Sequence, residues 1–108
     1  MKKIFFLIVP LLSFSQINLP VDFENSQVFN EDIVNFDGGS GYVVNNPQID
    51  SNNPSEQVGV IIRDGGTIWA GSYIELDSYL DFSSNTQISM SVYTPTTGLT
   101  VKFKLEGD

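Results

Sequence analysis

Two residue types on which many hydrolases depend are missing from this chain. Its 108 residues include no histidine and no cysteine. Ser–His and Cys–His nucleophile systems therefore cannot form within it, and neither can zinc sites built on those side chains. A carboxylate pair for glycoside cleavage stays formally possible, but neither Glu75 nor Glu106 lies in the apolar surroundings that a catalytic acid requires. We predict that the chain is not an enzyme.

Aromatic side chains are the main candidates for binding a ligand. Sugars are commonly held by stacking on an aromatic face while polar groups fix the hydroxyls. The candidates are Trp69, Tyr73, Tyr79 and Tyr93, with Arg63 as a hydrogen-bond donor.

Four of these five candidates have a structural alternative. Trp69 follows a Gly-Gly turn, and the interpretation favoured for it is a plug at one end of the core, since tryptophan is usually well buried. Tyr73 and Tyr93 fall on the polar faces of predicted strands, where cross-strand aromatic pairing is as good an explanation as a sugar platform. For Arg63, an ordinary surface ion pair with Asp64 is the favoured interpretation.

Carboxylates in predicted loops are candidate ligands for calcium, which prefers carboxylate and carbonyl oxygens. Asp22 and Glu24 lie near the first predicted strand, and Asp50, Asn53 and Glu56 lie in a polar loop. The alternative is that these are solvated loop acids, because the chain has no Asp-x-Asp-x-Asp-Gly motif.

The elements that must position these side chains are strands and turns. Apolar and polar residues alternate over residues 86–95 and 99–106, which is the period of a half-buried strand, and Pro95 and Gly98 between them predict a hairpin turn. Further strands are predicted at residues 20–24, 34–36, 42–45, 57–63 and 69–76, with a polar loop over 45–55. The run Asp-Gly-Gly-Ser-Gly at residues 37–41 is not followed by Lys-Ser/Thr or by a helix, so we interpret it as a flexible turn rather than a phosphate loop. Short strands separated by turns favour an antiparallel β-sandwich.

The first fifteen residues read as a secretion signal. Met1-Lys2-Lys3 is a basic start, residues 4–12 are apolar, and Ser13 and Ser15 are the small residues that a signal peptidase reads. The apolar run is shorter than the roughly 20 residues that span a bilayer, which disfavours a retained anchor. We predict residues 1–15 as a signal peptide, residues 16–108 as the β-sandwich domain, and export from the cell.

The net negative charge of the predicted domain disfavours some classes of binding partner. Removal of the two leader lysines changes the formal charge from −8 to −10 and leaves Arg63, Lys102 and Lys104 as the basic residues. Nucleic acid and anionic membrane surfaces both attract clustered Lys and Arg, so neither is predicted as a partner.

Several short motifs carry a resemblance to a known class of secreted module. They are LPVDFE at 19–24, NPSEQV at 53–58, WAGS at 69–72, DFS at 81–83, MSVYTP at 90–95 and KFKLE at 102–106. In these motifs the chain resembles jelly-roll domains similar to family 4/9 carbohydrate-binding modules, which have the galactose-binding-like fold. The resemblance spans nearly the whole of residues 16–108.

The resemblance implies both a fold and a function. It implies a jelly roll that continues for about 40 residues beyond Asp108, so this chain would be the N-terminal part of a longer module. It implies a non-catalytic module that holds a parent enzyme or a cell surface close to polysaccharide. It also implies a structural calcium, with Glu24 as the leading ligand and Asp50 next. The alternative is a structural or adhesion domain without affinity for sugar.

Overall fold

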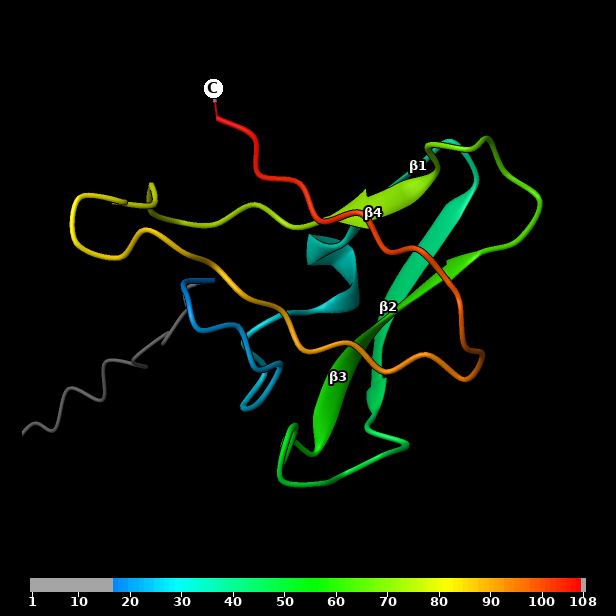
Figure 1. Ribbon diagram of the computed structural model, residues 1–108, viewed down its shortest axis with the longest axis horizontal. Coiled ribbons are helices and arrows are strands. Elements are labelled where there is room, and N and C mark those ends of the chain that lie inside the picture. The colour runs from blue at the N-terminus through cyan, green and yellow to red at the C-terminus, as the bar shows by residue number, and fades with distance from the viewer. Residues whose placement is uncertain (1–16, 108) are drawn as a thin grey trace, which may run out of the picture.

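The computed structural model describes residues 17–107, and it is built almost entirely from strands and loops. One short 3₁₀ helix, η1 (Asn30–Asp32), is followed by four strands. The strands are β1 (Val34–Phe36), β2 (Gly39–Asn45), β3 (Gln57–Arg63) and β4 (Gly71–Tyr73). They form two antiparallel sheets of two strands each, β1 with β4 and β2 with β3 (Figure 1). The expected all-β class is therefore correct.

The longer sheet is the hairpin of β2 and β3. Its register runs from Gly39 opposite Arg63 to Asn45 opposite Gln57, so all seven residues of each strand are paired. Asn46 closes the connecting loop: its side-chain amide donates to the carbonyls of Asn53 and Ser55, and its backbone N–H donates to the Glu56 carbonyl. The prediction of a strand at 57–63 and of a polar loop before it is confirmed.

The shorter sheet joins segments that are far apart in the sequence. Val34 of β1 lies opposite Tyr73 of β4, and Phe36 lies opposite Gly71. The rings of Phe36 and Tyr73 lie diagonally across the two strands, with centroids 6.2 Å apart. The predicted strand at 34–36 is confirmed, whereas only residues 71–73 of the expected strand at 69–76 are paired.

Glycines bring the two sheets into direct backbone contact. A Cβ placed on Gly39 of β2 would lie 2.1 Å from the carbonyl oxygen of Gly71 in β4, and one placed on Gly41 would lie 2.7 Å from Ser72 Oγ. The interpretation of residues 37–41 as a flexible turn was therefore wrong for most of the run. Asp37 and Gly38, with φ of 53° and 98°, form the turn, while residues 39–41 are strand residues whose missing side chains permit the contact.

The hairpin expected over residues 86–106 is only partly present. A turn occupies residues 95–98, with Gly98 at a φ of 82°, but residues 86–94 and 99–107 are not paired in a ladder within the described part of the chain. Figure 1 shows them as two traces, orange and red, that diverge from the turn. Alternation predicts which side chains would share a face, but hydrogen bonding needs a partner strand at the right distance. The described residues therefore show two small antiparallel sheets and two unpaired traces, and not the full β-sandwich that was expected.

Few apolar side chains are buried, and none is fully buried, in the described part of the chain. Among residues 17–107, the apolar side chains with less than a tenth of their surface exposed are Ile17 and Val28. Ile17 is held at the edge of the structure by its backbone, which accepts a hydrogen bond from the Asp77 N–H at 2.8 Å and donates one to the Asp77 carboxylate. The predicted signal peptide, residues 1–15, lies outside the described residues.

Candidate functional site

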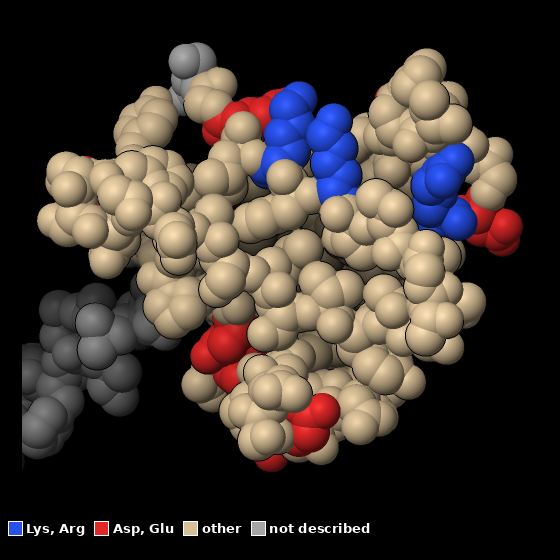
Figure 2. Space-filling view, in the orientation of Figure 1, with Lys and Arg blue, Asp and Glu red and all other residues tan. Residues whose placement is uncertain are grey.

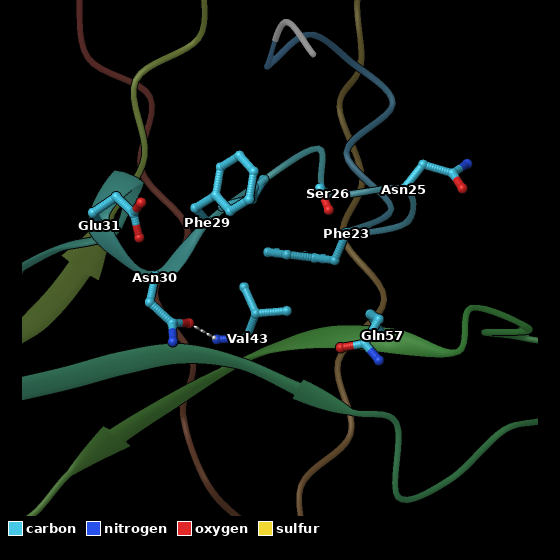
Figure 3. Close-up of a pocket in the computed structure, with 9 residues that line it drawn as sticks. Phe23, Asn25, Ser26, Phe29, Asn30, Glu31, Val43 and Gln57 are labelled. Atoms are coloured by element: carbon cyan, nitrogen blue, oxygen red, sulfur yellow. Dashed lines mark hydrogen bonds between the residues drawn. The ribbon is translucent and has the colours of Figure 1, made fainter. Parts of the chain in front are cut away.

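A hollow lies where an N-terminal loop crosses the β2–β3 hairpin. It has a volume of about 510 Å³, which is within the range of small-ligand pockets. Residues 23–31 form its walls, and Val43 of β2 and Gln57 of β3 contribute from the hairpin (Figure 3). The lining combines two aromatic rings with hydroxyl, amide and carboxylate groups: Phe23, Asn25, Ser26, Val28, Phe29, Asn30, Glu31, Val43 and Gln57.

The loop that walls this pocket has an unusual backbone. Phe23, Asn25 and Ser26 have φ values of 63°, 52° and 57°, in the left-handed region that non-glycine residues seldom occupy. Each such residue costs about 1–3 kcal/mol, and the conformation persists only where surrounding contacts hold it. Such strain is often found at ligand-binding sites.

Gln27 provides much of that support through both ends of its amide. Its Oε1 accepts hydrogen bonds from the backbone N–H groups of Asp22, at 2.9 Å, and Phe23, at 3.3 Å. Its Nε2 donates to the carbonyls of Asn18, at 3.2 Å, and Pro20, at 3.1 Å. One side chain therefore fixes the backbone of residues 18–23 and, with it, the direction in which Phe23 leaves the loop.

Phe23 reaches the hairpin because a glycine lies beneath it. A Cβ on Gly59 of β3 would lie 2.7 Å from Cζ of the Phe23 ring, so the ring occupies the space that any other residue would fill. Figure 3 shows the ring edge-on between Phe29 and Val43. Glu24, the next residue, accepts hydrogen bonds at Oε1 from the N–H groups of Glu56 and Gln57, which ties the loop to the start of β3.

The far wall of the pocket is η1. Asp32 accepts a hydrogen bond from the Phe29 N–H at 2.8 Å, which closes the single turn of the helix. Asn30 Oδ1 accepts from the Val43 N–H at 2.8 Å, which fixes η1 to β2 (Figure 3). Glu31, between them, lines the pocket with its carboxylate.

The ligand-binding residues expected from the sequence lie elsewhere. Trp69 is 64% exposed, so the favoured interpretation of a core plug was wrong: it lies at the end of the turn between β3 and β4 instead of inside a sandwich. Tyr73 is 47% exposed and is paired with Phe36, as the cross-strand alternative predicted. Tyr93 and Tyr79 are also exposed.

Arg63 has a structural role in the same turn. Its Nε donates a hydrogen bond to the Thr67 carbonyl at 2.9 Å, and the Thr67 N–H donates in turn to the Asp37 carbonyl. The guanidinium thereby holds the loop that follows β3 against the turn between β1 and β2. The sequence predicted Asp64 as the partner of Arg63, whereas the partner in the structure is the Thr67 carbonyl.

The expected calcium ligands accept backbone hydrogen bonds. Asp22 Oδ1 accepts from the Glu24 N–H, and Asp50 Oδ1 accepts from the N–H groups of Asn52 and Asn53. Within residues 17–107, no group of three acidic side chains lies close enough together to hold a metal ion. Calcium binding by Glu24, Asp50 and Asp22 stays a prediction.

Comparison with known proteins assigns no family to this geometry. No family model, no curated protein and no solved structure matches the chain. In the part of the chain that the structure describes, no helix has the length and apolar character needed to cross a membrane. The site must therefore be interpreted from its own residues.

Sequence reasoning missed the pocket because its residues are individually unremarkable. Phe29 and Glu31 carry no motif, Phe23 lies in the LPVDFE motif without being marked as a binding residue, and Gln27 is separated from its four hydrogen-bond partners by up to nine residues. One signal was available: Gly59 interrupts an otherwise apolar strand, and an isolated glycine in a strand often marks a close approach by another group.

Proposed function

We propose that this chain is a secreted, non-catalytic module that binds polysaccharide, and that it serves a parent enzyme or a cell surface. The observation that carries the proposal is the pocket between the 23–31 loop and the hairpin, where the rings of Phe23 and Phe29 lie beside polar side chains. Pyranose rings present apolar C–H faces and a rim of hydroxyls, which aromatic rings and polar groups respectively bind.

The charge of the pocket favours a neutral ligand. Glu31 is the charged residue in its lining, which includes no lysine or arginine. A carboxylate accepts hydrogen bonds from hydroxyl groups but repels phosphate, sulfate and uronate groups. Neutral glycans therefore suit the pocket better than anionic ones.

The same lining supports binding rather than cleavage. Glycoside hydrolases of the common mechanisms place two carboxylates on either side of the scissile bond. Glu31 is the one carboxylate among the nine lining residues. A module of this kind would act by holding a glycan near another protein or domain that modifies it. In the fuller jelly roll that the resemblance implies, the two sheets would be the beginning of the sandwich.

Retention on insoluble neutral polysaccharides tests this proposal. We expect the full-length protein to be retained, and Phe29→Ala and Glu31→Gln to lower its affinity about tenfold each, because one removes a stacking face and the other a charge-assisted acceptor. Both side chains are at the surface, so circular dichroism and thermal melting should stay close to wild type. The assay is run with and without calcium, because the predicted calcium site would make retention depend on the ion.

Tyr73→Ala and Tyr93→Ala are the matched variants outside the pocket. If these variants lose retention while Phe29→Ala keeps it, the exposed tyrosines form the sugar platform and the pocket assignment is wrong. If the wild-type protein is retained on no neutral polymer, with or without calcium, the alternative of a structural or adhesion domain without sugar affinity replaces the proposal.

A further inference from the structure

The segment after the last turn has the alternating sequence of a β-strand but is not paired with another strand. In residues 99–106, here named the C-terminal segment, Val101, Phe103 and Leu105 alternate with Lys102, Lys104 and Glu106. The three apolar side chains are 51%, 47% and 44% exposed. No backbone hydrogen bond joins the C-terminal segment to any other described residue. Its N–H and C=O groups are therefore open to another strand.

The C-terminal segment is also the basic part of an acidic molecule. Lys102 and Lys104 are two of the three basic residues among residues 17–107, whereas the whole chain has 13 acidic residues. Figure 2 shows two basic side chains next to each other on one face, well separated from the third. Lys104 forms an ion pair with Glu106, and no side-chain partner occupies Lys102 within the described residues.

We propose that the C-terminal segment is a docking edge for an extended peptide strand of a partner protein, in which apolar residues alternate with acidic ones. The strand would add by backbone hydrogen bonding, as in other cases of β-augmentation. Its apolar side chains would cover Val101, Phe103 and Leu105, and its carboxylates would lie opposite Lys102 and Lys104, where opposite charges stabilise a cross-strand pair.

The charges allow a second copy of this chain in some registers and not in others. In an antiparallel pair of two C-terminal segments, the registers that keep the apolar faces together are centred on a residue. Centring on Lys102, Phe103 or Lys104 sets at least one lysine opposite another, and like charges directly opposite each other destabilise a pair. Centring on Val101 avoids this, and centring on Leu105 sets Lys104 opposite Glu106. A foreign acidic strand meets both lysines with opposite charge in every register, so it is the occupant proposed here, and the experiment must separate it from a second copy.

Fluorescence anisotropy with synthetic peptides tests the proposal. The probe is a labelled, end-capped octapeptide of alternating valine and glutamate, titrated with the full-length protein at low and high salt. We expect saturable binding that weakens as salt is raised, because exposed charge pairs are screened. A valine–lysine octapeptide should bind at least tenfold more weakly, and a valine–glutamate peptide N-methylated along one edge should lose binding, because it cannot donate to the C-terminal segment.

Two variants of equal charge change localise the effect. Lys102→Gln with Lys104→Gln should weaken peptide binding at least tenfold, whereas Gln48→Glu with Asn52→Glu, in the exposed loop between β2 and β3, should leave it unchanged. The proposal is overturned if the acidic peptide shows no saturable binding, if N-methylation makes no difference, or if both double variants behave alike. It is also overturned if sedimentation shows a dimer that the lysine substitutions abolish, because a second copy would then be the occupant.

Discussion

Gln27 is the residue on which the loop of the candidate site most depends. Its amide makes four hydrogen bonds to backbone groups between Asn18 and Phe23, two as acceptor and two as donor. An amide can provide two donors and an acceptor oxygen from one side chain, whereas a carboxylate only accepts and an ammonium only donates. Glu24 adds a second tie, to the start of β3, so two adjacent stretches of the loop are held by side chains.

Gln27→Glu separates the acceptor role of the Gln27 side chain from its donor role. It keeps the acceptor for Asp22 and Phe23 but removes the donors to Asn18 and Pro20, and it sets a negative charge against two carbonyl oxygens. We expect a loss of about 1–3 kcal/mol in the free energy of unfolding, measured by urea denaturation.

Gln48→Glu is the matched control for this substitution. Gln48 is exposed in the loop between β2 and β3, and its backbone N–H rather than its side chain makes the hydrogen bond there. It should change stability by less than about 0.5 kcal/mol. Equal urea midpoints for the two variants would show that the Gln27 amide does not hold the loop.

At the scale of secondary-structure elements, the two sheets are in contact through glycines. The β2 strand approaches β4 so closely at Gly39 and Gly71 that no side chain fits between their backbones. Phe36 of β1 covers the other part of this contact, because its ring lies 3.0 Å from the position of a Gly71 Cβ. The relative placement of the sheets therefore depends on two glycines that lie 32 positions apart in the sequence.

Gly39→Ala should separate the sheets at this point. The added methyl group would meet the Gly71 carbonyl oxygen and backbone, which cannot turn away as a side chain can, so we expect a loss of about 1–3 kcal/mol or more. Gly107→Ala is the control, since a Cβ there meets no atom within 4 Å. Differential scanning calorimetry measures both. A melting temperature for Gly39→Ala that matches the control would contradict the close contact.

The whole molecule is strongly acidic and has little buried surface. Among residues 17–107, the buried apolar side chains are Ile17 and Val28 and neither is fully buried, so little hydrophobic stabilisation opposes the mutual repulsion of the carboxylates. The ion pair of Lys104 with Glu106 holds the pKa of that glutamate below its ordinary value, and the hydrogen bonds from Ser83 do the same for Asp81. A lowered pKa in the folded state means that these local contacts weaken as pH falls through the acid range, but both groups are fully exposed and their effect on stability is small.

Salt should therefore stabilise this protein. We expect the melting temperature to rise between 10 and 150 mM sodium chloride, because the Debye length falls from about 30 Å to about 8 Å over this range and repulsion between carboxylates is screened. Most of the rise should occur below 150 mM, and thermal melting followed by circular dichroism measures it. A melting temperature that falls or stays level over this range would show that repulsion is not what limits stability.

The parts of the fold that depend on residue types within a short segment were predictable from the sequence. Residues 57–63 read as a strand because β-branched residues cluster there, and the strand has these bounds in the structure. Residues 37–41 read as a turn, and the two positive φ values confirm this for Asp37 and Gly38 alone, since residues 39–41 belong to β2. The candidate site was not predictable in this way, since Phe23, Glu31 and Val43 come together only when the 23–31 loop crosses the hairpin.

The sequence alone determined the all-β class, the positions of β1 and β3, the acidic character of the molecule and the absence of histidine and cysteine chemistry. These properties depend on residue type and short-range periodicity, which a linear chain already contains. Tertiary structure decided that β1 pairs with β4, that Trp69 is exposed, that Arg63 serves a turn, and that residues 86–94 and 99–107 run without a ladder. Each of these features depends on a group that is distant in the sequence but close in the fold. Hydrogen bonds and burial contribute to stability only when such a group is in place.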